Sequence, residues 1–210
     1  MNVLRVDSSI QGPASASSEL ADLAEAAWVA ERPDTTFTRR HLGTDPLPSD
    51  TWANAAAAGF MAAEQRSEAG RSALAFAGSL ADEVRTADAA ILALPLYNYG
   101  VSQHVKTWID LLIAGGSPGE RLLLGKPVIL LTTRGGSYAP GTPREGWDHN
   151  TSFLVRIFAD LWDADLTLIE REFTLVGINP ALDEFTEAAA TMKNAAHEAA
   201  AAAGRALAIR

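Results

Sequence analysis

The 210-residue sequence contains no cysteine, and this absence excludes several kinds of chemistry at once. Without cysteine the chain forms no disulfide, offers no thiolate to a metal and has no thiol nucleophile. Long apolar runs are also missing, since none reaches the roughly 18 residues that a membrane-spanning helix needs. Residues 1–6 lack the basic, apolar and cleavage regions of a secretory signal. These absences together predict a cytoplasmic protein with no membrane partner.

Positive charge is scarce, because 17 lysines and arginines face 26 aspartates and glutamates and leave a net charge of −9. Binding to a nucleic acid requires clustered lysine and arginine side chains that neutralise phosphates. The four histidines are scattered along the chain and show no metal-ligand spacing. The sequence therefore predicts no nucleic-acid partner and no metal site.

Short apolar stretches alternate with amphipathic ones along the chain. We expect strands over residues 3–9, 35–42, 89–97, 127–136 and 165–175. Helical periodicity starts at Leu20, precedes Arg85, resumes at Val105, recurs around 152–162 and follows Asn179-Pro180. Strands that alternate with helices form a parallel sheet with helices on both faces. We predict an α/β fold in one domain over residues 1–210, with a flavodoxin-like, doubly wound, five-stranded sheet of order 2-1-3-4-5.

Residues 43–72 form the least regular segment of the sequence. We interpret them as a loop with one helical stretch, in which Trp52 and Phe60 cover neighbouring structure. A second long excursion spans residues 137–151. Both are interpreted as walls of a substrate pocket, for which Tyr138, Trp147 and Phe153 are the candidate residues.

Unusual residues follow the first, third and fourth predicted strands, which are neighbours in such a sheet. Serine hydroxyls and the amides of a helix N-terminus suit a phosphate group, although helix capping is the alternative role for Ser15. The second loop contains two tyrosines and an asparagine, and the third contains two glycines that permit close approach of a flat ligand. Ligands of doubly wound sheets bind at this edge, near the topological switch point. We therefore expect the three loops to face one crevice.

The motifs in these loops are SSIQGPASAS (8–17), PLYNY (95–99) and TRGG (133–136). In order and in residue type they resemble the three signature loops of the FMN-dependent NADH-azoreductase and quinone-reductase family. The resemblance covers nearly the whole chain. The resemblance implies that twelve residues of these loops contact the cofactor, namely Ser9, Ser15, Ala16, Ser17, Leu96, Tyr97, Asn98, Tyr99, Thr133, Arg134, Gly135 and Gly136.

The resemblance also implies an activity. It implies an FMN cofactor, NADH or NADPH as electron donor, a homodimer, and ping-pong two-electron reduction of quinones, azo compounds or related conjugated aromatic acceptors. Since the flavin carries the redox chemistry, no side chain is predicted to be catalytic. Residues 114–124 and 137–150 depart from the family pattern, so the resemblance supports flavin binding more strongly than azo-dye reduction.

Two other classes of function share this scaffold. The first is an electron carrier or flavin-binding regulatory module without a substrate of its own. The second is a hydrolase, which the missing G-x-S-x-G nucleophile motif disfavours.

Overall fold

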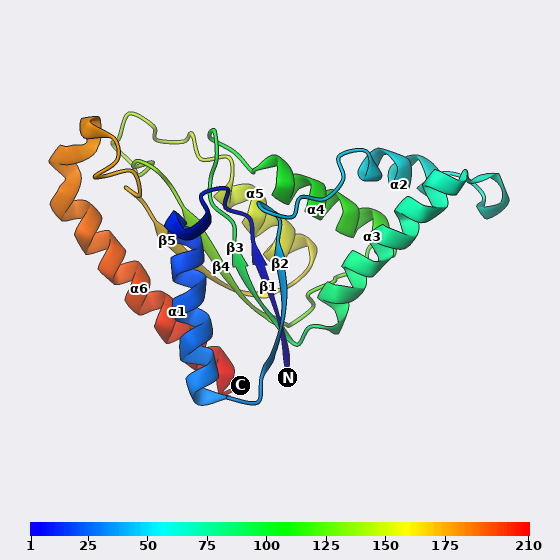
Figure 1. The fold of residues 1–210 in the computed structure, drawn as a ribbon, viewed down its shortest axis with the longest axis horizontal. Coiled ribbons are helices and arrows are strands. Elements are labelled where there is room, and N and C mark those ends of the chain that lie inside the picture. The colour runs from blue at the N-terminus through cyan, green and yellow to red at the C-terminus, as the bar shows by residue number, and fades with distance from the viewer.

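The computed structural model describes residues 1–210 and has a five-stranded parallel sheet at its centre (Figure 1). The strand order is β2-β1-β3-β4-β5, and every neighbouring pair is parallel. The predicted sheet and its order are confirmed. The strands are β1 (Asn2–Asp7), β2 (Thr36–His41), β3 (Ala89–Ala93), β4 (Pro127–Thr133) and β5 (Asp165–Arg171).

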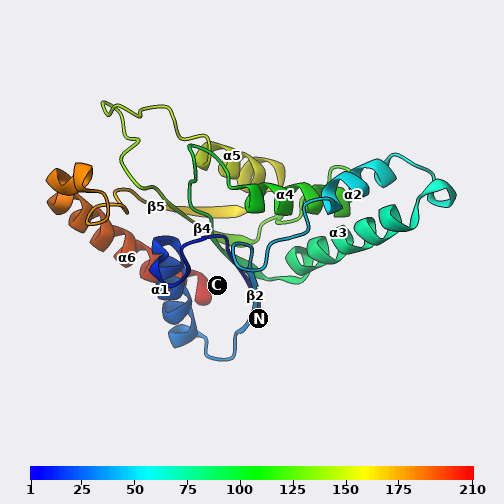
Figure 2. The same ribbon diagram turned by 45° about the horizontal axis from the view of Figure 1, so that its top comes forward.

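Helices cover both faces of the sheet, as Figures 1 and 2 show. One face carries α1 (Ala16–Glu31) and α6 (Thr186–Ala208), which pack against each other. The opposite face carries α2 (Thr51–Gly59), α3 (Glu68–Thr86), α4 (Gln103–Gly115) and α5 (Thr151–Val155). Short 3₁₀ turns occupy Gly12–Ala14, Ala63–Gln65 and Pro180–Phe185. None of the helices has the length and apolarity to cross a membrane.

Side chains of the strands alternate between two apolar cores. On β3, Leu92 points into the core beneath α3, α4 and α5, while Ile91 points toward α1 and α6. Strands that are buried on both faces read as continuous apolar runs, which is why β3 and β4 stand out in the sequence. Trp108 belongs to the first core and Trp28 to the second.

The predicted strands are too long at their carboxyl ends. We expected the third strand to reach residue 97, but β3 ends at Ala93. The apolar character continues because Leu94 and Leu96 are buried in the loop that follows. Pro95 between them has no N–H to donate to a sheet ladder. Backbone hydrogen bonds to β4 continue past Ala93, from the Leu94 N–H to the Leu131 carbonyl and from the Leu96 N–H to the Thr133 carbonyl, so the apolar run marks burial and not the end of the regular strand.

The prediction for residues 43–72 is wrong in its detail. The segment contains α2 and the start of α3, whose first turn is capped by the Ser67 hydroxyl accepting from the Gly70 N–H at 3.0 Å. Figure 1 shows this helical pair extending away from the centre of the sheet. Trp52 is 46 % exposed and Phe60 is 94 % exposed, so neither side chain covers the structure.

The helix predicted around residues 152–162 is regular only in α5. The chain continues as a π-helical segment over Arg156–Leu161, in which the Trp162 N–H donates to the Ile157 carbonyl at 3.0 Å. The wider turn changes which side chains face inward. Phe158 and Trp162 both enter the core, with ring centroids 5.7 Å apart.

Candidate functional site at the strand ends

The loops after β1, β3 and β4 meet around a cavity of about 300 Å³, which we call the strand-end cavity. Ten of the twelve residues predicted to contact a cofactor line it, and so does Tyr138. The ten are Ser9, Ala16, Ser17, Leu96, Tyr97, Asn98, Tyr99, Thr133, Gly135 and Gly136. Residues that lie more than 120 positions apart in the sequence thus share one crevice.

The serine loop forms the hydroxyl-rich part of the strand-end cavity. The Ser9 and Tyr97 hydroxyls are 3.1 Å apart, and the Ile10 N–H donates to the same tyrosine oxygen at 3.1 Å. The Gln11 N–H donates to the Ser9 hydroxyl at 3.2 Å. The first loop is therefore connected to the second through the Tyr97 phenol.

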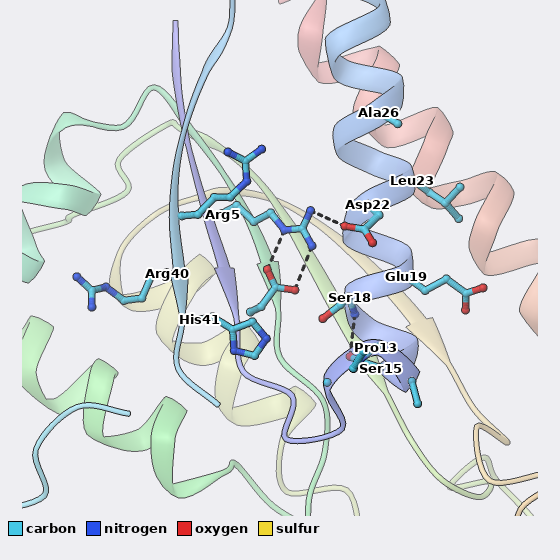
Figure 3. A pocket seen from close by; sticks show the side chains of 14 residues that line it. Arg5, Pro13, Ser15, Ser18, Glu19, Asp22, Leu23, Ala26, Arg40 and His41 are labelled. Carbon is cyan, nitrogen blue, oxygen red and sulfur yellow. Dashed lines mark hydrogen bonds and ion pairs between the residues drawn. The ribbon is translucent and has the colours of Figure 1, made fainter. Parts of the chain in front are cut away.

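Ser15 is a helix cap, which is the alternative role predicted for it. Its hydroxyl caps α1 by accepting from the Ser18 N–H at 3.1 Å, and the Ser17 hydroxyl lies 3.2 Å from it. Ser15 does not line the strand-end cavity. Ser15 instead lines a second cavity of about 1000 Å³ between α1 and the edge of the sheet, which we call the larger cavity. Figure 3 shows Ser15 there beside Ser18.

The second loop contains a strained turn over residues 97–100. The Tyr97 N–H donates to the Gly100 carbonyl at 3.2 Å, and the Gly100 N–H donates back to Tyr97 at 3.0 Å. Asn98 and Tyr99, between them, have φ values of 48° and 68°. This is a type I′ geometry, for which Asn-Gly is the preferred pair. A tyrosine in the left-handed region costs about 1–3 kcal/mol, and here its ring packs against Tyr138 and Trp147.

Free backbone donors surround the strand-end cavity. The N–H groups of Asn98 and Tyr99 have no hydrogen-bond partner within the chain, and neither do those of Gly135 and Gly136. A Cβ on Gly135 would lie 2.6 Å from the Leu175 side chain, so a larger residue there would require that leucine to move. The two loops therefore offer amides to a ligand along two sides of the crevice.

Arg134 points away from the strand-end cavity and into a cluster of three carboxylates. Its Nε lies 2.6 Å from Asp148 Oδ2, its Nη1 lies 3.3 Å from Glu172 Oε1, and its Nη2 pairs with Glu170. Burial acts to lower the pKa of Arg134, but the charges of Glu170 and Asp148 outweigh it and raise that pKa. Burial acts to raise the pKa of Asp148, but hydrogen bonds from Thr151 and the charge of Arg134 hold it below its ordinary value.

This cluster also anchors the 137–151 excursion. Glu172 accepts from the Ser137 hydroxyl at 2.6 Å and from the Tyr138 N–H at 2.8 Å. At the other end of the excursion, the buried Asn150 amide donates to Thr132 Oγ1 at 3.0 Å. Sequence reasoning had no signal for Glu172 or Asn150, because their partners lie on other elements.

An aromatic group forms the outer wall of the strand-end cavity. The Tyr99 ring packs edge-on against Tyr138 and Trp147, with centroid distances of 6.4 and 5.5 Å. Trp147 supports this wall from outside and does not line the cavity. Phe153, the third predicted pocket residue, packs against the core beneath α3 and α4. Of the two excursions, only 137–151 contributes side chains to the cavity.

Five further residues line the strand-end cavity. Gln11 and Pro95 lie within the signature motifs but were given no role of their own, and Arg144, Thr174 and Leu175 were missed by sequence reasoning. Thr174 and Leu175 follow β5 and belong to no motif, so nothing in the sequence marks them. Gly43 was missed as well, although a Cβ there would lie 2.2 Å from the Ser9 carbonyl oxygen. That glycine lets the chain after β2 pack directly beneath the serine loop.

Comparison with known proteins identifies the family of this chain. The family model described as a flavodoxin-like fold matches residues 1–202. The chain belongs to this family. Within it, the chain is 39% identical over 191 residues to an FMN-dependent NADH:quinone oxidoreductase of Frankia casuarinae, covering 89% of this chain and 90% of that protein. A protein of the same name from Parafrankia sp. is 35% identical over 204 residues, covering 95% and 96%.

Solved structures of other proteins have the same fold. The azoreductase AzrA superposes with a TM-score of 0.78 at 21% identity, covering 98% of this chain and 100% of that one. An FMN-dependent NADH-azoreductase from Bacillus anthracis in complex with FMN gives a TM-score of 0.70 at 14% identity, covering 97% and 99%. The resemblance seen in the three sequence motifs is confirmed.

Proposed function

We propose that this protein is an FMN-dependent oxidoreductase that takes electrons from NADH and reduces quinones, azo compounds or related conjugated aromatic acceptors. One observation carries the proposal: the signature loops after β1, β3 and β4 converge on a single cavity. The names of the relatives that cover about nine-tenths of the chain support the same activity.

The residues of the strand-end cavity fit an FMN molecule in chemistry and in order. Ser9 and Ser17 offer hydroxyls beside the N-terminus of α1, where a phosphate dianion is favoured. Leu96 and Pro95 offer flat apolar surface, and Gly135 and Gly136 permit close approach of a ring. No carboxylate lines the cavity, so nothing in its lining opposes an anionic cofactor.

When bound, FMN supplies the hydride-accepting and hydride-donating chemistry. The chain binds and orients the cofactor through the loops described above. The free N–H groups of Asn98, Tyr99, Gly135 and Gly136 provide fixed dipoles for negative charge that develops during reduction. The aromatic wall of Tyr99 and Tyr138 limits access of water and offers stacking surface to a conjugated acceptor.

We further propose a cytoplasmic homodimer of single-domain subunits. Tyr99 and Trp147 are exposed at the mouth of the strand-end cavity, where a second copy would cover them. Sedimentation velocity measures the mass of the assembly and so tests the dimer. Cell fractionation tests the cytoplasmic location. A single cooperative unfolding transition is expected if each subunit is one domain.

Reduction of the purified protein tests the proposed function. We expect a yellow protein whose flavin absorbance is bleached by NADH under anaerobic conditions and returns on addition of menadione. Ser17→Ala and Asn98→Ala should weaken FMN retention, whereas Ser79→Ala, on the exposed side of α3, should not. A colourless protein that takes up no added FMN would contradict the proposal. A flavoprotein that NADH leaves oxidised would instead be an electron carrier or regulatory module.

A further inference from the structure

Arg144 is the one charged side chain among the residues that line the strand-end cavity. It lies in the 137–151 excursion, with its guanidinium carbon 5.9 Å from the Tyr99 ring centre and 6.0 Å from that of Tyr138. A Cβ on Gly136 would lie 3.3 Å from Arg144 Nη1, so the glycine leaves room for the guanidinium. Two aromatic rings therefore hold a cation at the mouth of the cavity.

This guanidinium is without an acidic partner. Arg144 forms no ion pair in the structure and donates no side-chain hydrogen bond. Its five N–H donors are thus available to a ligand. In a chain with a net charge of −9, the nearest counter-ion for such a group would usually be a carboxylate of the protein itself.

The arginines around the larger cavity differ in this respect. Arg5 lies 2.8 Å from Asp7 and 2.7 Å from Asp22, and Figure 3 shows its guanidinium directed at the latter. Arg40 donates to Glu83 at 3.0 Å, and Arg39 pairs with Glu25. An anion that entered that cavity would meet cations already neutralised. Arg144 is consequently the better candidate for recognising an anionic ligand.

The position of Arg144 separates it from the part of the strand-end cavity that suits a phosphate of the cofactor. The Ser9 hydroxyl lies beside Tyr97, whereas Arg144 lies with Tyr99, Tyr138 and Gly136. We propose that Arg144 determines substrate specificity by pairing with an acidic group of the molecule that stacks beside the cofactor. The acidic group is a carboxylate or sulfonate of the acceptor or the diphosphate of the nicotinamide donor, which share the geometry that a guanidinium binds. This inference rests on the proposed function.

Methyl red and its methyl ester provide a matched pair of acceptors, because they differ in charge at one carboxyl group. With Arg144→Ala, we expect the KM for methyl red to rise about tenfold or more, since a hydrogen bond to a charged group is lost, while the KM for the ester changes less than about twofold. Arg144→Lys should restore part of the difference because it keeps the charge without the planar fork. Arg205→Ala, which removes an exposed and unpaired arginine from α6, is the control for net charge.

Two further measurements separate the sources of the acidic group. Stopped-flow reduction by NADH gives the donor dissociation constant, which rises in Arg144→Ala if the diphosphate is the group recognised. Calorimetric titration of the oxidised holoprotein with methyl red, without donor, measures acceptor binding independently of turnover. High salt should weaken whichever interaction Arg144 makes in the unaltered protein and have little effect in the alanine variant.

The outcomes distinguish this inference from the proposed function. Equal effects of Arg144→Ala on methyl red and its ester, with unchanged NADH binding, would overturn the role of Arg144. Both acceptors would still be reduced in that case, and the proposed function would stand. A chain that binds no FMN would overturn the two together.

Discussion

Replacement of Arg134 by methionine tests how the strand-end cavity is supported. Arg134 is 8 % exposed and is the common partner of Asp148, Glu170 and Glu172. Methionine retains much of the aliphatic volume but leaves Asp148 and Glu172 with no cation beside them. Both carboxylates have side chains less than about one-seventh exposed, so water compensates little for the lost partner.

Breaking a buried ion pair from one side costs about 3–5 kcal/mol in free energy of unfolding. A domain of this size loses about 2–4 °C of melting temperature for each kcal/mol, so Arg134→Met should melt about 6–20 °C lower. Arg121→Met is the matched control. Arg121 pairs with Asp163 at the surface, where both side chains are about half exposed, and its loss should cost at most about 1 kcal/mol.

The pH dependence gives a sharper test of the same variant. The pKa of Asp148 is held below its ordinary value, so its contribution to stability is present above the unfolded pKa of about 3.9 and is lost as pH falls through the folded pKa. Loss of Arg134 removes one of the causes that lower the pKa of Asp148, so that pKa is higher in the variant, and protonation at low pH removes the unpaired charge. The difference in free energy of unfolding between the unaltered protein and Arg134→Met should therefore be largest near neutral pH and become smaller toward about pH 4.

Urea unfolding of the FMN-free protein, followed by circular dichroism at both pH values, measures this difference. Adding Glu172→Gln to Arg134→Met should recover part of the loss, because it removes one of the unpaired charges. A loss below about 1 kcal/mol at neutral pH would show that the cluster does not support the fold. A difference of the same size at both pH values would refute the electrostatic explanation.

Three other substitutions probe the site and the core. Gly43→Ala should displace the serine loop, because its Cβ would lie 2.2 Å from the Ser9 carbonyl oxygen; FMN titration by fluorescence should show weaker binding, and unchanged affinity would contradict the contact. Tyr97→Phe removes the phenol that joins the first two loops and should cost about 0.5–1.5 kcal/mol per lost hydrogen bond in thermal unfolding, with no change expected if the loops are independent. Trp108→Ala empties the core beneath α4 and should cost about 3–5 kcal/mol in urea unfolding, and a cost below about 1 kcal/mol would mean that the core collapses around the gap.

The elements that sequence reasoning predicted well are those with strong local patterns. β3 and β4 are short apolar runs bounded by turn residues, and α4 repeats apolar residues at helical spacing. Alternation of these elements predicted the parallel sheet, and the match of five strands over this length to the flavodoxin-like fold predicted its order. The segment over residues 43–72 was interpreted poorly, because alanine and glycine leave its helical periodicity weak and the exposed Trp52 and Phe60 imitate a core pattern.

For the candidate site, too, sequence reasoning placed some residues correctly and others not. Ten of the twelve signature positions reached the strand-end cavity because they lie at or beyond the carboxyl ends of β1, β3 and β4, and parallel strands present those ends at one edge. Ser15 and Arg134 did not reach it. The Ser15 hydroxyl caps α1, and the Arg134 guanidinium enters the carboxylate cluster, because folding places their partners beside them.

The sequence by itself determined the alternating strands and helices of the α/β fold and the three loops that face the crevice, because hydrophobic period and turn chemistry are local properties. Only the tertiary structure decided the direction of individual side chains. It turned Arg134 away from the strand-end cavity and left Arg144 in it without a carboxylate partner. Pairing of charges depends on distances between residues far apart in the chain, and those distances exist only after folding.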